Sequence, residues 1–134
     1  MKTTLTLFGT GGGGGGESSG NIMVSYTISG KPIDGQVILI PIIGGVTITL
    51  PEDLTGSIGV AGTIADAIST FTIYKNTTSI GTFQFAAAAS ICTFTFASEV
   101  ELDGDSGDYL KIIAPSSADA TLADIGMSLK GTVS

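Results

Sequence analysis

The sequence of 134 residues contains no histidine, no arginine and no tryptophan, and its only cysteine is Cys92. Without histidine, no serine–histidine or cysteine–histidine pair and no histidine-ligated catalytic metal is available. A pair of carboxylates for glycoside hydrolysis is not ruled out by spacing, because such a pair is assembled in three dimensions. However, tryptophan for sugar stacking and histidine for proton transfer at neutral pH are both missing. These absences predict a protein that is not an enzyme.

Charge is also scarce. Charged residues make up 13% of the chain, about half of the roughly 25% usual in soluble domains. Twelve carboxylates against five lysines give a net charge of −7, and nucleic acid is excluded as a partner because phosphate binding needs a cationic footprint. The mean hydropathy is +0.48. Together these values predict that a protein partner, most simply further copies of the chain, covers part of the surface.

Long apolar runs are absent as well. The most apolar stretch, Val37 to Leu50, contains Pro41, Gly44 and Gly45 and is shorter than the roughly 20 residues of a membrane-spanning helix. Met1-Lys2 is followed by alternating threonine and leucine rather than by the continuous apolar core of a signal peptide. We therefore expect neither a membrane segment nor an export signal. Cys92 lacks a partner for an internal disulfide, and we expect a buried structural thiol.

The richest pattern lies between Ser69 and Phe96, which contains five of the six phenylalanines. Apolar and hydroxyl-bearing residues alternate there in three successive segments, separated first by the polar reversal at residues 76–79. A period of two with β-branched and aromatic residues is typical of half-buried antiparallel strands. We predict three consecutive strands that supply most of the large core side chains.

Short strands are predicted along the rest of the chain as well. They cover residues 2–8, 21–28, 36–43, 46–50, 57–65, 108–114 and 122–129, and turn signals separate them. The run 36–43 is nearly all apolar, which is typical of a strand buried on both faces, and residues 99–108 form an acidic connection. The chain is predicted to be all-β, an antiparallel β-sandwich of jelly-roll type with eight to ten strands.

The N-terminal part differs from the rest, because residues 9–20 contain few side chains to bury and include six consecutive glycines. A glycine run has no unique conformation of its own. A phosphate-binding loop would close with Lys-Ser or Lys-Thr, whereas Glu17-Ser18-Ser19 follows here. We therefore divide the chain into an N-terminal strand with a flexible glycine-rich arm (1–20) and a β-sandwich domain (21–134). The arm makes the first strand detachable and able to pair with another chain.

One group of residues has the composition of a site. Glu99, Glu101, Asp103, Asp105 and Asp108 form an acidic cluster, and three of its carboxylates lie on the turn Asp103–Asp108. A hard cation such as calcium uses oxygen ligands of this kind, but the glutamate that an EF-hand loop requires at its twelfth position is replaced by Ala114. Aspartate and glycine are also the ordinary residues of β-turns, and we favour the turn. No catalytic, cofactor-binding or metal-binding residue is assigned.

Several segments resemble a family of small structural proteins of tailed-bacteriophage virions, found as capsid decoration or head-fibre proteins and in tail fibres. The likeness covers roughly residues 46–132, and its clearest part is APSSADATL, from Ala114 to Leu122. Where such segments commonly carry Lys-Asn-Gly at a hairpin, this chain has Lys75-Asn76-Thr77. The loop Asp103–Asp108 also departs from the usual pattern, and the family supplies no catalytic residues to transfer.

The resemblance implies a non-enzymatic role in the virion, assembled in the host cytoplasm, as a trimer or another symmetric homo-oligomer. The first hypothesis is a capsid decoration (cement) protein that binds the major capsid protein or another virion protein and stabilises the coat lattice. The alternative is a tail-fibre or adhesin module that binds a host surface glycan through its polar loops. A carboxylate-based hydrolase is a distant third hypothesis, given the absence of histidine.

Overall fold

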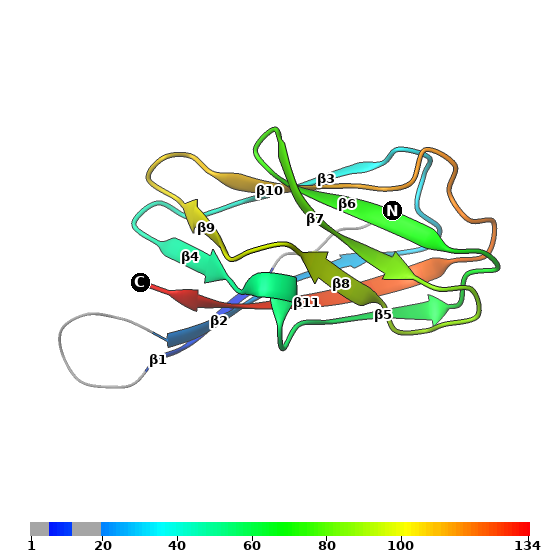
Figure 1. Cartoon of the computed structure of the whole chain (residues 1–134), viewed down its shortest axis with the longest axis horizontal. Coiled ribbons are helices and arrows are strands. Elements are labelled where there is room, and N and C mark those ends of the chain that lie inside the picture. Colours follow the sequence, from blue (N-terminus) through cyan, green and yellow to red (C-terminus); the bar gives the residue numbers. More distant parts are fainter. Residues whose placement is uncertain (1–5, 12–19) are drawn as a thin grey trace.

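The computed structural model describes residues 6–11 and 20–134, with side chains from residue 20 onward (Figure 1). The described part consists of strands and one short 3-10 turn. They are β1 (Thr6–Gly11), β2 (Gly20–Ile28), β3 (Val37–Pro41), β4 (Thr47–Leu50), η1 (Glu52–Leu54), β5 (Ile58–Thr63), β6 (Ser69–Lys75), β7 (Thr78–Phe85), β8 (Thr93–Phe96), β9 (Val100–Asp103), β10 (Tyr109–Ile113) and β11 (Ala123–Val133).

The strands form two antiparallel sheets that pack face to face (Figure 1). The first sheet has the order β1-β2-β11-β4-β9, with β5 also paired to β11, and the second has the order β3-β10-β6-β7-β8. The chain crosses between the sheets repeatedly, since β2, β4, β9 and β11 belong to the first sheet and β3, β6 and β10 to the second. The predicted all-β antiparallel sandwich is confirmed.

The core lies between the two sheets and follows from strict alternation along the strands. In β2, the side chains of Ile22, Val24, Tyr26 and Ile28 are buried while the residues between them are exposed or half-buried. The long strand β11 alternates in the same way, from Ala123 to Gly131. Because every second residue of a strand faces the same side, each sheet contributes one apolar face to the interior.

The aromatic ribbon β6–β7–β8 forms three consecutive strands of the second sheet, as the sequence pattern predicts. Phe71 and Phe83 lie opposite each other on β6 and β7, and their rings stack with a centroid distance of 4.6 Å. Phe85 packs edge-on against Phe83, and Phe96 of β8 is also buried. Threonines lie on the opposite face of these three strands, so the face that points away from the core exposes hydroxyl groups to water.

Strand β3 does not fit its prediction. The run 36–43 is predicted to be buried on both faces, but only its alternate residues Ile38, Ile40 and Ile42 face the core. The side chains of Val37 and Leu39 are 52% and 59% exposed. The reason is position: β3 lies at the end of its sheet, and among the described residues only β10 is paired with it.

Three further expectations change. Residues 99–108 are not only a connection, because they include β9, which pairs with β4. The described part of the chain has eleven strands rather than eight to ten. The first strand, predicted over residues 2–8, extends to Gly11, so two glycines of the expected arm, Gly9 and Gly11, belong to it, and it pairs with β2 of the same chain. Residues 1–5 and 12–19, which include the rest of the arm, lie outside the described residues.

Within the described ranges, no helix is long and apolar enough to cross a membrane.

Candidate functional site

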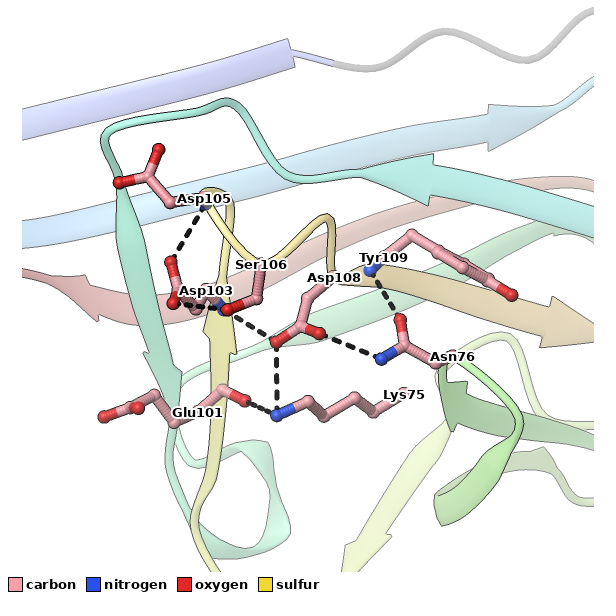
Figure 2. Close-up of polar contacts among 8 residues, drawn as sticks. All are labelled: Lys75, Asn76, Glu101, Asp103, Asp105, Ser106, Asp108 and Tyr109. Carbon is pink, nitrogen blue, oxygen red and sulfur yellow. Dashed lines mark hydrogen bonds and ion pairs between the residues drawn. The ribbon is translucent and has the colours of Figure 1, made fainter.

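The acidic turn between β9 and β10 brings three of the five predicted carboxylates together (Figure 2). Asp103 Oδ1 accepts a hydrogen bond from the backbone N–H of Asp105 at 2.9 Å, and its Oδ2 accepts one from the Ser106 hydroxyl at 2.8 Å. Asp105 Oδ1 in turn accepts the N–H of Gly45, in the β3–β4 loop, at 2.7 Å. The carboxylates therefore close the turn and tie it to a neighbouring loop.

Asp108 is the buried member of this group, at 8% exposure. Its carboxylate accepts the side-chain amide of Asn76 and the backbone N–H of Asp103, both at 2.9 Å, and pairs with Lys75 Nζ at 3.2 Å (Figure 2). The Asn76 amide is the largest cause that lowers the pKa of Asp108, followed by the Asp103 N–H and then Lys75. The group is held ionised, as a buried carboxylate with several donors should be.

The same network fixes the β6–β7 hairpin. Asn76 has a positive φ of 55°, a conformation that asparagine tolerates better than most residues. Its side-chain oxygen accepts the N–H of Tyr109 at 3.0 Å, and its own N–H donates to the Tyr109 carbonyl at 2.9 Å. Lys75 also donates to the backbone carbonyl of Glu101 at 2.7 Å. The hairpin is thereby joined to both strands that flank the acidic turn.

The two glutamates do not complete a site. The carboxylate of Glu101 points away from Lys75 and Asp108 (Figure 2). Glu99 lies instead beside a shallow hollow of about 280 Å³ on the outer side of the first sheet, with Lys130. Asn21, Thr49, Pro51, Thr55, Gly131 and Thr132 also line this hollow. In the described part of the chain, no group of three or more cysteine, aspartate or glutamate side chains has an arrangement that would hold a metal ion.

A second carboxylate centre, at Asp119, was not singled out from the sequence. Its Oδ1 accepts the backbone N–H groups of Thr121 and Leu122 at 2.8 and 2.9 Å, and its Oδ2 accepts that of Ala67 at 2.9 Å. These bonds, that from the Leu122 N–H first, hold the pKa of Asp119 far below its usual range. The local sequence does indicate this role, because an aspartate followed two residues later by threonine is typical of an Asx-type turn.

The remaining loops use aspartate in the same way. Asp34 accepts the N–H of Ala118, Asp53 that of Phe96, and Asp124 that of Gly30. Seven of the eight aspartates therefore accept at least one backbone N–H; they are Asp34, Asp53, Asp103, Asp105, Asp108, Asp119 and Asp124. Their chemistry in this fold is to hold loops together.

Cys92 is buried, which confirms the prediction for this residue. Burial raises the pKa of its thiol to about 11, and a protonated thiol is a poor nucleophile. The space around it is tight, since a Cβ added to Gly59 would lie 2.5 Å from Cys92 Sγ and 2.6 Å from Met127 Sδ. Gly59 therefore packs closely against side chains, and a larger residue would not fit at this position.

Tyr26 is the one described residue with a buried side-chain oxygen or nitrogen that has no hydrogen-bond partner. Burial, with a smaller contribution from Cys92, raises the pKa of Tyr26 well above its usual value. The hydroxyl is therefore neutral and serves no visible chemistry.

Comparison with protein-family models, with curated proteins and with solved structures finds no match to this chain.

Proposed function

We propose that this chain is a non-enzymatic structural protein of a tailed-bacteriophage virion, and specifically a capsid decoration protein that binds the coat lattice and stabilises it. One observation carries the proposal. Seven aspartates hold loops together through backbone N–H groups, while ten large apolar side chains are exposed in the described residues: Met23, Ile33, Val37, Leu39, Ile43, Ile58, Val60, Ile64, Ile68 and Ile91. Such a surface is suited to burial against other subunits rather than to catalysis.

The strand order adds support from analogy. Without β1, β5 and β8, the two sheets have the orders β2-β11-β4-β9 and β3-β10-β6-β7. We interpret this arrangement of eight strands, with successive crossings between the sheets, as a jelly roll, a fold that viral capsid proteins and lectins use. The fold alone does not define function, so the exposed apolar surface remains the main argument.

The mechanism follows from multivalency. Each copy, within a trimer or another symmetric homo-oligomer, docks on the major capsid protein by subunit packing and by strand addition at the outer edge of β1, whose other edge is paired with β2. Each docking contributes a modest free energy, and many copies that bridge neighbouring capsomers add these contributions together.

Particles produced by the strain that encodes the chain test this proposal. Quantitative mass spectrometry of purified virions should find the chain in hundreds of copies, and electron microscopy should place it on the shell. A handful to a few dozen copies at the tail would favour the fibre module. Absence of the chain from purified particles would overturn both functions.

The tail-fibre or adhesin alternative is favoured by one observation, the hollow that Lys130 and Glu99 line together with threonines and Asn21. Hydroxyl, amide, carboxylate and ammonium groups meet there, which is the set of donors and acceptors that a sugar requires. A glycan array probed with the purified chain tests this function directly. Binding that is lost in Lys130→Ala would support it, and a clean negative array would leave decoration as the surviving function.

A further inference from the structure

Sheet edges present unpaired backbone groups, and natural proteins cover or charge them to prevent pairing with other chains. In this protein β9 carries Glu101 and Asp103. The edge of β8 is covered by η1, whose Asp53 accepts the N–H of Phe96 at 2.9 Å. Each of these edges is therefore protected.

The edge of β5 is also occupied. The segment 90–92 lies along it, with the N–H of Ala61 donating to the Ser90 carbonyl at 2.9 Å and the N–H of Cys92 donating to the Gly59 carbonyl at 3.0 Å. The apolar side chains of Ile58 and Val60 are exposed on this strand, but its backbone is not open to a partner strand.

β3 is different, because it has neither charge nor cover along its open side among the described residues. The bonds from Ala114 N–H to the Gln36 carbonyl and from Ile42 N–H to the Asp108 carbonyl show that even-numbered residues face β10. In an antiparallel pair the intervening residues then point their backbone groups outward. Val37 and Leu39 therefore present N–H and C=O groups at the edge, and Pro41 presents a carbonyl.

The neighbouring cation leaves this edge uncovered. Lys111 of β10 lies directly beside Leu39 in the register and is the residue that would shield it. Instead, its ammonium group lies over the ring of Tyr74, on the far side from β3, at 4.9 Å from the ring centroid. A cation is attracted to the face of an aromatic ring, so Lys111 stays over Tyr74 and does not shield Leu39.

We propose that β3 pairs edge to edge with β3 of a second copy, antiparallel about a two-fold axis at Leu39. The two Leu39 residues exchange N–H and C=O groups, and each Val37 N–H donates to the partner's Pro41 carbonyl. This gives about four hydrogen bonds across the edge, by the spacing of antiparallel ladders. Proline removes a donor but no acceptor, so Val37 and Pro41 remain compatible in this register.

A second copy can approach this edge without bringing carboxylates together, and its β3 offers the matching donor and acceptor pattern. The chain carries a net charge of −7, so most approaches of two copies bring carboxylates together. The outward residues of β3 and β10 include none: they are Val37, Leu39 and Pro41 on β3, and Tyr109, Lys111 and Ile113 on β10. Asp34 and Asp105 lie beyond the ends of the strand. Their repulsion is screened over about 8–10 Å in physiological salt, so pairing strengthens as salt is added.

The contact is small. A five-residue strand covers much less than the roughly 800 Å² per partner of a standard stable interface, so an isolated pair is weak. It becomes effective where copies are already held close together, by a particle or by a larger oligomer. A two-fold contact makes dimers, and it is independent of the virion role proposed above.

Cysteine crosslinking in the full chain detects such a weak pair. In Leu39→Cys the two thiols lie on Cα atoms about 5.5 Å apart across the axis, within the range that a disulfide bridges. Ile58→Cys is the matched control, because Ile58 is 51% exposed on a strand with an occupied edge. In both variants Cys92 stays in place, buried. With oxidised glutathione, Leu39→Cys should form a disulfide-linked dimer about tenfold faster than Ile58→Cys, because pairing raises the effective thiol concentration.

The register supplies a second, independent readout. A mixture of Val37→Cys and Pro41→Cys proteins should crosslink faster than either variant alone, since these two positions face each other only across the proposed axis. Equal crosslinking rates for Leu39→Cys and Ile58→Cys, or no preference in the mixture, would overturn the proposal. Circular dichroism confirms that each variant is folded. Neither result bears on the virion role, which depends on the copy number in particles.

Discussion

Strands β3 and β6 belong to the same sheet and are both rich in apolar residues, but they use them differently. β6 lies between two strands, buries Phe71 and Ile73 and shows threonines to water. β3 lies at the end of the sheet, buries Ile38 and Ile40 and still exposes Val37 and Leu39. A central strand needs apolar residues on one face only. The second apolar face of β3 therefore does not enlarge the core, and it is the surface beside which we propose that a second copy pairs.

The largest loss of stability is expected for a substitution on the buried face of the strands β6, β7 and β8. Phe83→Ala removes a fully buried ring that stacks on Phe71 and contacts Phe85 and Phe94. Large-to-small substitution of a core aromatic costs about 3–5 kcal/mol of stability. Urea unfolding followed by circular dichroism should show a correspondingly lower midpoint. A loss below about 1 kcal/mol would mean that this core is not packed as described.

Acid should weaken the loops that join the two sheets before it affects the strands. The folded-state pKa values of Asp108 and Asp119 are lowered, below the unfolded value of about 3.9. Their stabilisation is therefore present above pH 4 and is lost as the pH falls through the folded pKa values. The urea concentration at the unfolding midpoint should therefore decrease as the pH is lowered from 5 to 2.

Asp119→Asn is the matched variant for this pH effect. It keeps the size of the side chain but removes the charge, so its stability should be lower than that of the native chain at pH 7 and should change less on acidification. An unchanged pH profile in this variant would show that Asp119 does not contribute.

A smaller effect, of opposite sign, is expected inside the first sheet. Tyr26→Phe removes the buried hydroxyl that has no hydrogen-bond partner. An unsatisfied buried polar group costs about 1–3 kcal/mol, so the variant should be at least as stable as the native chain. Thermal or urea unfolding measures the change. A loss of more than about 1 kcal/mol would mean that the hydroxyl has a partner in solution, such as a buried water.

The smallest effect on folding should come from the edge. Leu39→Thr gives β3 the hydroxyl surface that β6 already has, and a substitution at an exposed position usually changes stability by less than about 0.5 kcal/mol. Its unfolding curve should overlay that of the native chain, while the solubility at high protein concentration rises. A large loss of stability would show that Leu39 is part of the core after all.

The sequence predicts the sandwich well, because alternation with a period of two is a local property of each strand. It predicts β6 closely and β2 to within a residue, whereas β7 begins at Thr78, inside the reversal predicted at residues 76–79. The exposure of Val37 and Leu39 was not predictable, since it depends on the place of β3 in the sheet, which is a long-range property.

For the acidic residues too, the local features are predictable from the sequence and the long-range contacts are not. The turn at Asp103–Asp108 was found from its composition, but its link to Lys75 and Asn76 depends on pairing between β6 and β10. The turn that Asp119 makes with Thr121 and Leu122 follows from the local sequence, but its bond to Ala67, 52 residues away in the sequence, does not.

The pairing of β2 with β11 has a consequence for how the protein is made. Ser25 and Ser128 lie side by side although 103 residues separate them, and β11 also holds β4 and β5 in the sheet. During synthesis, β2 (residues 20–28) cannot pair with β11 until residues 123–133 have been made, so the first sheet cannot be completed before then. Assembly dominated by distant pairings is slow, so newly synthesised chains should spend measurable time as clients of chaperones.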